Sequence, residues 1–192
     1  MKYKSNGFLV VSPSKTINGI SYCGVDTDVW PADEWLFSDP NSPRHEYSVI
    51  DYEKVFLLDM GSAAKYYEYC LSKGIHARLL YCESTTEGTF YEKNSFFDSL
   101  DKVLLLGYDY AYPNGDYYSA ILNDIIYRDL DFSRKWKPQL NKNGLFSSFE
   151  VVSSFSKDRE RTSILANNGS PYPVYELGQF SVFRIYQIKG TL

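Results

Sequence analysis

Residues 54–83, KVFLLDMGSAAKYYEYCLSKGIHARLLYCE, decide the fold class that the sequence predicts. The segment opens with an apolar run, 54–60, which is typical of a buried strand. Ser62 is then a suitable N-cap for a helix, and Gly74 is a suitable residue to end it. Residues 75–83 return as a second apolar strand. Because a helical crossover of this length joins parallel strands with a right-handed connection, we expect a β-α-β unit.

Further strand and helix patterns flank this unit on both sides. The sequence predicts a pair of strands at 8–12 and 20–25 with a turn near Asn18 and Gly19, and a further strand at 102–110. It also predicts helices over 118–125 and after Ser147, with a strand over 149–152 as the alternative to the second helix, and a hairpin over 174–188. No internal repeat or low-complexity linker divides the chain. We therefore predict one α/β domain over residues 1–192, in which helices flank a mixed β-sheet with a parallel centre and antiparallel edge hairpins.

The composition and charge describe a globular, tyrosine-rich, acidic protein. Of its 192 residues, 44% are hydrophobic and 23% charged, and 18 are tyrosines. The formal net charge is −4: residues 1–130 contain 19 acidic and 11 basic residues, whereas residues 131–192 contain 9 basic and 5 acidic ones. A nucleic-acid-binding protein needs a basic surplus to neutralise phosphates, so we expect no nucleic-acid partner.

The cysteines and the apolar runs indicate the compartment. Cys23, Cys70 and Cys82 are odd in number and widely spaced, which favours buried free thiols in a reducing environment. The apolar run near the N-terminus is too short for a signal peptide, and no run reaches the length of a membrane span. We expect a cytoplasmic protein that does not bind membranes.

Motifs that identify a reaction are missing from the sequence. It has no phosphate-binding loop, dinucleotide-binding fingerprint, nucleophile elbow or zinc-protease motif. His45 and His76, the two histidines, lack metal-ligand spacing with any other histidine or cysteine. We therefore predict neither a metal nor a cofactor, and no catalytic residue.

One group of residues could nevertheless form a small-ligand site. Asp59, Ser62, Glu83 and Asp109 follow or end predicted strands, and ligands gather beyond the carboxyl ends of parallel strands. Carboxylates at such an edge could transfer protons or hold a cation. The alternative interpretation is that each of these residues caps its own turn or helix.

Two segments combine aromatic rings with carboxylates, a composition that is common at protein interfaces. We predict that these segments contact a protein partner through Asp26, Asp28, Trp30, Asp33, Glu34, Trp35, Tyr110, Tyr112 and Asp116. The alternative is that the rings fill the hydrophobic core.

The second segment belongs to the stretch LGYDYAYPNGDYY at residues 106–118. A small, acidic, tyrosine-rich chain of this kind resembles the immunity proteins of bacterial contact-dependent or polymorphic toxin systems. The resemblance implies a protein that binds a cognate toxin domain and covers its active site without performing chemistry.

We therefore predict a non-enzymatic inhibitor that occludes a toxin domain with a basic surface through an acidic, aromatic surface of its own. Two alternatives remain open. The first is a small-ligand-binding protein or enzyme that uses the carboxylates at the edge of the sheet. The second is a structural subunit of a larger assembly.

Overall fold

A computed structural model describes residues 3–11, 15–26, 41, 57, 59–85, 103–112, 118–166 and 180–189. The strands are β1 (Lys4–Val11), β2 (Lys15–Ile17), β3 (Ile20–Tyr22), β4 (Arg78–Ser84), β5 (Val103–Tyr112), β6 (Tyr118–Ser119) and β7 (Ser181–Ile188). The helices are α3 (Met60–Ser72), the π-helix η4 (Ile121–Ile126), α4 (Asp131–Trp136), the 3₁₀-helix η5 (Lys137–Gln139) and α5 (Phe149–Ala166).

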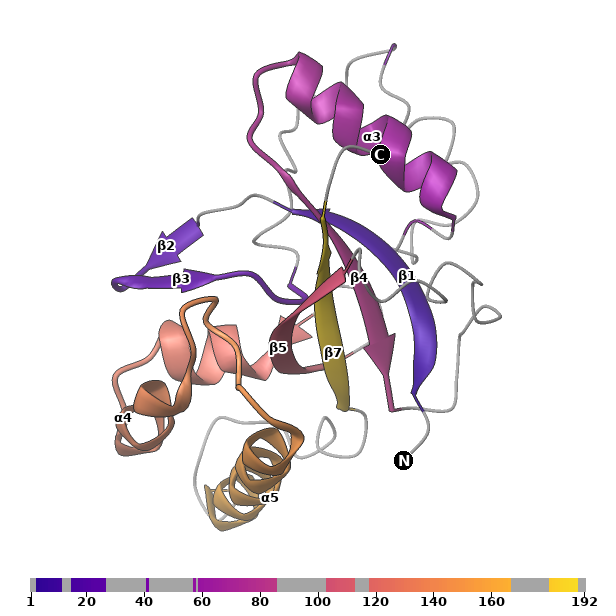
Figure 1. The fold of residues 1–192 in the computed structure, drawn as a ribbon. Helices are drawn as coiled ribbons and strands as arrows, with labels where there is room; N and C mark the ends of the chain where they lie inside the picture. Colours follow the sequence, from indigo (N-terminus) through magenta and orange to yellow (C-terminus); the bar gives the residue numbers. More distant parts are fainter. Residues whose placement is uncertain are drawn as a thin grey trace.

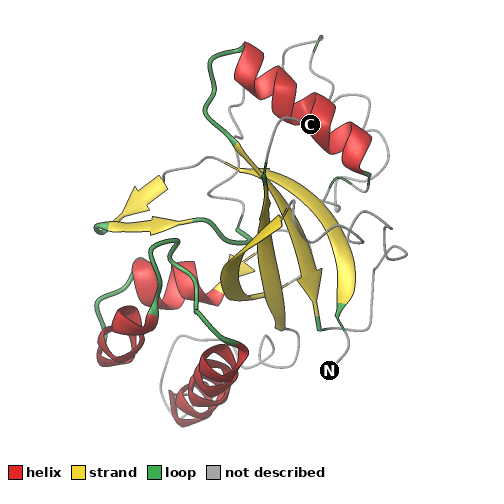
Figure 2. Ribbon diagram, in the orientation of Figure 1, coloured by secondary structure: helices red, strands yellow, loops and turns green. Residues whose placement is uncertain are grey.

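The main sheet has five strands in the order β1-β4-β7-β5-β6, and every neighbouring pair is antiparallel. Strands β2 and β3 form a separate two-stranded hairpin. In the view of Figure 1, α3 lies above the sheet, and α4 and α5 lie below it. Figure 2 shows the same arrangement by type of secondary structure.

The predicted parallel centre of the sheet is wrong. Helix α3 does lead into β4, but β4 lies between β1 and β7 and is antiparallel to both. Of the described residues in the predicted strand 54–60, Leu57 makes an isolated antiparallel bridge to Phe8, and Met60 already begins α3. The predicted partner of β4 is therefore replaced by β7, which comes from the C-terminal end of the chain. A local pattern identifies a strand, whereas its neighbour is selected by contacts distant in sequence.

Helices α3 and α5 form where the sequence predicts them, but their caps differ by a few residues. The side chain of Asp59, rather than that of Ser62, caps α3, and Gly74 follows its C-terminal end. At the start of α5 the hydroxyl of Ser148, rather than that of Ser147, accepts a bond of 3.4 Å from the N–H of Val151. Such shifts arise because several neighbouring polar residues can satisfy the same free N–H groups.

Two predicted elements near the surface also differ. The predicted pairing of 8–12 with 20–25 is wrong: β1 pairs with β4, and β3 turns back onto β2 through Asn18 and Gly19. Both turn residues have positive φ, 50° and 78°, as a tight two-residue hairpin turn requires. The predicted helix 118–125 begins instead with β6 and continues as the π-helix η4.

Hydrophobic clusters lie on both faces of β1 and β4. One cluster packs these strands against α3 and contains Phe8, Val10, Ala63, Tyr66, Cys70, Leu79, Tyr81 and Ile188. The larger cluster uses the alternate residues Leu9, Val11, Leu80 and Cys82, and joins them to η4, α5 and the β2–β3 hairpin. This alternation follows from the period of two in a strand. The three cysteines are buried and form no disulfide, as predicted.

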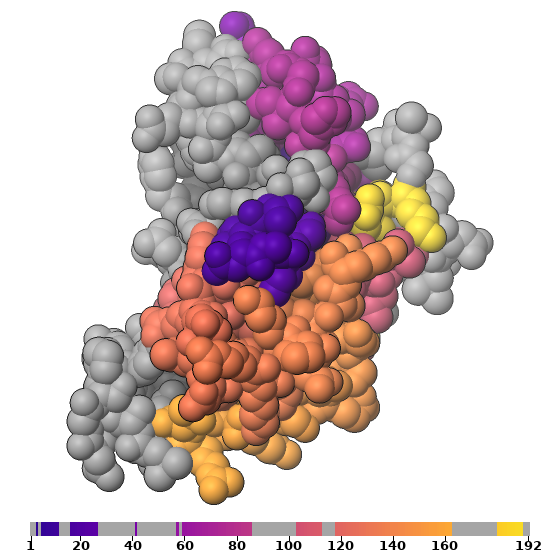
Figure 3. Space-filling view, turned by 90° about the vertical axis from the view of Figure 1, so that its left-hand side faces the viewer, coloured from indigo at the N-terminus to yellow at the C-terminus, as the bar shows by residue number. Residues whose placement is uncertain are grey.

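The β2–β3 hairpin is fastened to the segment that contains η4 and α4. The amide group of Asn18 donates to the carbonyl of Ile126 at 2.8 Å, and the N–H of Cys23 donates to the carbonyl of Asn143 at 3.0 Å. Figure 3 shows this contact from the side, with the hairpin in indigo against residues in orange. The hairpin thereby positions residues 23–26, which reach the polar network described below.

Candidate functional site

Asp59 and Ser62 lie together, but they bond to each other at the start of α3. One carboxylate oxygen of Asp59 accepts from the N–H of Ser62 at 2.8 Å, and the other accepts from its hydroxyl at 2.6 Å. Burial opposes ionisation, but these bonds hold the pKa of Asp59 below its usual range. The pair therefore acts as a helix cap.

Asp109 lies in the middle of β5 and is completely buried. Its Oδ2 accepts bonds from the hydroxyl of Tyr22 at 2.6 Å and the N–H of Val25 at 2.8 Å. Its Oδ1 accepts from the hydroxyl of Ser119 at 2.7 Å and the N–H of Tyr110 at 2.8 Å. Burial raises the pKa of Asp109, although all four bonds favour the ionised form. This carboxylate joins β3, β5 and β6 and has its acceptor sites occupied.

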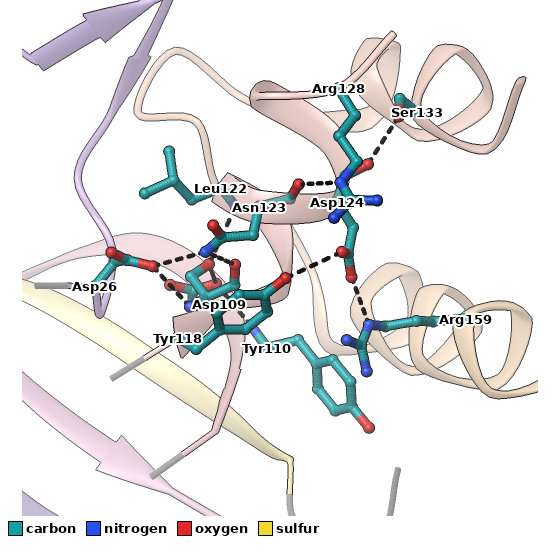
Figure 4. A network of polar contacts seen from close by, with 11 residues as sticks. Asp26, Asp109, Tyr110, Tyr118, Leu122, Asn123, Asp124, Arg128, Ser133 and Arg159 are labelled. Atoms are coloured by element: carbon teal, nitrogen blue, oxygen red, sulfur yellow. Dashed lines mark hydrogen bonds and ion pairs between the residues drawn. The ribbon is translucent and has the colours of Figure 1, made fainter. Parts of the chain in front are cut away.

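The same network continues to Asp26, as Figure 4 shows. The carboxylate of Asp26 accepts bonds from the N–H of Ser119 at 2.8 Å and the side-chain amide of Asn123 at 3.0 Å. Asp26 is buried, so its carboxylate links the chain after β3 to β6 and η4. The side chain predicted to face a partner therefore lies inside the protein.

A buried ion pair forms the other end of the network. The carboxylate of Asp124, in η4, accepts a bond of 2.6 Å from Nε of Arg159, in α5. The guanidinium carbon of Arg159 also lies 4.1 Å from the centre of the Phe180 ring. A π-helix is rare and is often found near functional sites. Here η4 directs Asn123 and Asp124 to opposite ends of one structural network (Figure 4).

The predicted aromatic contacts divide between the core and the part of the chain that is not described. Tyr110 is buried and stacks on Phe180 at 5.2 Å, with Phe155 at 6.0 Å on edge. Tyr112 is half-buried against Phe180 at 5.8 Å. The other predicted contacts lie outside the described residues: Asp28, Trp30, Asp33, Glu34, Trp35 and Asp116.

Glu83 belongs to a different group, which we name the tyrosine–arginine cluster: Tyr3, Glu83, Tyr108, Arg184 and Tyr186. Glu83 of β4, Arg184 of β7 and Tyr108 of β5 are cross-strand neighbours in one row of the sheet, so their side chains leave the same face. Glu83 and Arg184 form an ion pair. The guanidinium carbon of Arg184 lies 3.5 Å from the centre of the Tyr3 ring and 5.9 Å from that of Tyr186.

The cluster is partly open to solvent. All five residues are half-buried, and the side chains of Arg184 and Glu83 are 27% and 12% exposed. Burial raises the pKa of Tyr186 to about 12 and also raises that of Tyr3, so both phenols are neutral at pH 7. The cluster therefore presents neutral hydroxyls and aromatic rings around one internally paired cation.

Arg184 has hydrogen-bonding capacity left over. Within the described structure its Nε is buried and has no partner, because Glu83 engages only Nη2. The side-chain amide of Asn6, next to Ser5 in the neighbouring strand β1, also has no partner there. Unpaired buried polar groups of this kind are uncommon in native proteins.

The structure does not gather Asp59, Ser62, Glu83 and Asp109 into one site. Asp59 and Ser62 cap α3, and Glu83 pairs with Arg184. Asp109 and Glu83 leave opposite faces of the sheet, because their β7 neighbours Phe183 and Arg184 are adjacent residues of one strand. In the ranges the structure describes, no three histidine, cysteine or acidic side chains are grouped to hold a metal ion.

Sequence reasoning missed four members of the tyrosine–arginine cluster, because they come from three separate segments of the chain and Glu83 comes from a fourth. The available signal was the alternation of Arg184 and Tyr186 in the C-terminal strand, which places both on one face. Recognising that Glu83 lies beside them requires the register of β4 against β7.

Comparison of the chain with protein-family models, curated sequences and solved structures gave no match. Within the described part of the chain, no helix is both long enough and apolar enough to cross a membrane.

Proposed function

We propose that this protein is a non-enzymatic inhibitor that binds another protein through the tyrosine–arginine cluster. The observation that carries the proposal is the grouping of three half-buried tyrosines around Arg184 on one face of the sheet. Tyrosine and arginine are enriched at the few positions that dominate binding energy in protein interfaces. Tyrosine gives a large contact area while ordering few rotatable bonds.

The charges of the cluster also suit the centre of a protein interface. Glu83 neutralises Arg184 within the protein, so a partner need not bury an unpaired charge against it. The exposed part of the Arg184 side chain, 27% of its surface, suits contact with a backbone carbonyl or carboxylate of the partner.

The biological role that we propose is immunity, namely occlusion of a toxin domain with a basic surface in the bacterial cytoplasm. Two features support it. The net charge of −4 favours encounter with a basic protein. The character of the sequence, small, acidic and rich in tyrosine, resembles that of immunity proteins.

The test begins with capture of the partner by the tagged full-length chain and identification by mass spectrometry. The purified partner is then titrated calorimetrically against the wild type and against Tyr3→Ala and Tyr108→Ala. If either ring is a dominant contact, its removal should weaken binding by about 30-fold, which corresponds to about 2 kcal/mol.

Tyr127→Ala is the matched control, because Tyr127 is 41% exposed and lies outside the cluster. It should bind with wild-type affinity, and thermal melting should show that all three variants are folded. Wild-type affinity in both cluster variants, or an equal loss in Tyr127→Ala, would refute this assignment of the interface.

A further inference from the structure

A pair of exposed leucines lies at the beginning of β5, away from the tyrosine–arginine cluster's charged centre. Leu104 is 45% exposed and Leu105 is 42% exposed. Strand β5 pairs with β7 along its length, but β6 covers only Ala111 and Tyr112 on the other side. An exposed apolar strand edge is a template for pairing with another chain.

The hydrogen-bonding pattern shows which backbone groups face outward at this edge. The carbonyl of Val182 in β7 accepts a hydrogen bond from the N–H of Thr85, which follows β4. Successive residues of a strand turn their backbone groups to opposite sides, so every second residue of β7, counted from Val182, turns its N–H and C=O toward β4. Tyr186 is one of them, and Leu105 is its neighbour in β5. The N–H and C=O of Leu105 therefore point away from β7, and by the same alternation so do those of Val103.

Contacts farther along β5 agree with this assignment. Tyr108, opposite Arg184, exchanges two backbone hydrogen bonds with Phe146 on the outer side, at 2.8 and 3.0 Å. The carbonyl of Leu106 is covered by the side-chain amide of Asn141 at 2.8 Å. The outer edge is thus occupied from Leu106 onward.

The preceding part of the edge has no partner among the described residues. Among the residues that the structure describes, none bonds to the outward backbone groups of Val103 and Leu105. Another extended backbone presents a matching row of alternating donors and acceptors at this spacing.

We propose that a second copy of this chain occupies the edge, so that two β5 strands pair in antiparallel orientation about a two-fold axis. The outward groups at 103 and 105 fix the register, because each hydrogen-bonded pair must join two outward-facing residues. Val103 then pairs with Leu105 of the second copy, Leu105 pairs with its Val103, and Leu104 lies opposite Leu104.

This register makes the edge complementary to itself. Directly opposed residues without mutual hydrogen bonds have the closest side chains in an antiparallel pair, with Cα atoms about 4.5 Å apart. Leu104 occupies that position in both copies, so the exposed leucines cover each other. The strand residues Val103 to Leu106 carry no charge that would oppose the pairing. The contact is isologous and closes as a dimer instead of extending into a fibre.

The two-fold axis is perpendicular to the sheet, so both tyrosine–arginine clusters lie on the same side of the joined sheet. The dimer does not depend on the proposed function, because its contacts are made by other side chains. Since only a few residues per copy take part, the interface belongs to the small class, below about 1,200 Å², and the dimer should dissociate on dilution.

The test is sedimentation velocity of the full chain over a wide concentration range. The wild type should show a concentration-dependent monomer–dimer equilibrium. Leu104→Lys should be monomeric at every concentration, because it places two like charges directly opposite each other. Leu130→Lys is the matched control, since Leu130 is 51% exposed in the loop before α4, and it should dimerise like the wild type.

A second pair of variants separates backbone pairing from side-chain contact. Leu105→Ala keeps the outward N–H and should retain a weakened dimer. Leu105→Pro lacks that N–H and should abolish the dimer, and proline is tolerated at an edge position where no internal hydrogen bond is lost. Melting curves establish whether the variants are folded. If Leu105→Pro is not folded, Leu104→Lys alone tests whether the β5 edge forms the dimer.

Hydrogen exchange of the wild type adds a readout that needs no substitution. The amide of Leu105 should exchange more slowly at high protein concentration than at low concentration. A wild type that stays monomeric would overturn the proposal, as would a dimer that survives Leu104→Lys. Protection of Leu105 by a different protein, with no self-association, would also overturn it and would assign the edge to that protein.

Discussion

The substitution Asp109→Asn tests whether the buried carboxylate holds the core together through its acceptor sites. Each oxygen of Asp109 accepts one backbone N–H and one hydroxyl: Val25 and Tyr22 on one side, Tyr110 and Ser119 on the other. Asparagine keeps the size and shape of the side chain but replaces one acceptor with a donor. The substitution therefore changes hydrogen bonding with almost no change in packing.

The magnitude follows from these four bonds. Whichever way the new amide is oriented, one backbone N–H loses its acceptor and one hydroxyl must reverse its role. A bond to a charged acceptor contributes about 1.5–3 kcal/mol, and a stranded buried donor costs about 1–3 kcal/mol. Relief from burying a charge offsets part of the loss, so we expect a net decrease in the free energy of unfolding of about 3 kcal/mol. For a chain of this length that lowers Tm by about 10 °C.

The assay is urea unfolding at pH 7 followed by circular dichroism, with Asp59→Asn as the matched control. Asparagine caps a helix as well as aspartate does, so the control should change the free energy of unfolding by less than about 0.5 kcal/mol. If Asp109→Asn is within about 1 kcal/mol of the wild type, or no worse than Asp59→Asn, the carboxylate does not hold the core in the way we describe.

Two further predictions concern the frame around the network. Gly107 has φ of 150°, and a Cβ there would lie 2.6 Å from the carbonyl oxygen of Phe146, so Gly107→Ala should lower the free energy of unfolding by about 2–3 kcal/mol. Gly74→Ala, at an open position, should lower it by only about 1 kcal/mol in the same melts. The hydrogen bond from Lys135 holds the pKa of Asp158 below its usual range, so the ionised form stabilises the native state above the ordinary pKa of aspartate. Asp158→Asn should therefore lower the free energy of unfolding by about 1 kcal/mol at pH 7. This difference in stability from the wild type should vanish as the pH falls through the lowered pKa of Asp158. A difference in stability that persists in acid would contradict this explanation.

The local elements could be predicted because their signals are contained in neighbouring residues. The apolar face of α3, the glycine after it, and the positive-φ turn at Asn18 and Gly19 are each specified within a few positions. The strand character of 75–83 and 102–110 follows in the same way, and these runs became β4 and β5. What they could not specify was their order, because β7 enters between them from the far end of the chain.

The candidate site was less predictable than the fold. Asp26 and Tyr110 belong to residue types that are common at protein interfaces. In the structure, however, hydrogen bonds hold Asp26 and ring packing holds Tyr110 in the interior of the protein. Asp109 resembles a strand-end acid in the sequence, although its carboxylate lies in the middle of β5 among four donors. Burial depends on which segments cover a residue, and that information is not local.

By itself, the sequence determined the class of molecule: a globular α/β chain with buried cysteines that form no disulfide, and with helices at α3 and α5. Periodicity and capping are properties of neighbouring residues in the sequence, so they can be recognised without knowledge of the fold. Only the tertiary structure decided that the sheet is antiparallel, that Glu83 meets Arg184, and that no described residue bonds to the outer edge at the beginning of β5. Each of these depends on strand register, which is selected by the summed packing of side chains distant in sequence.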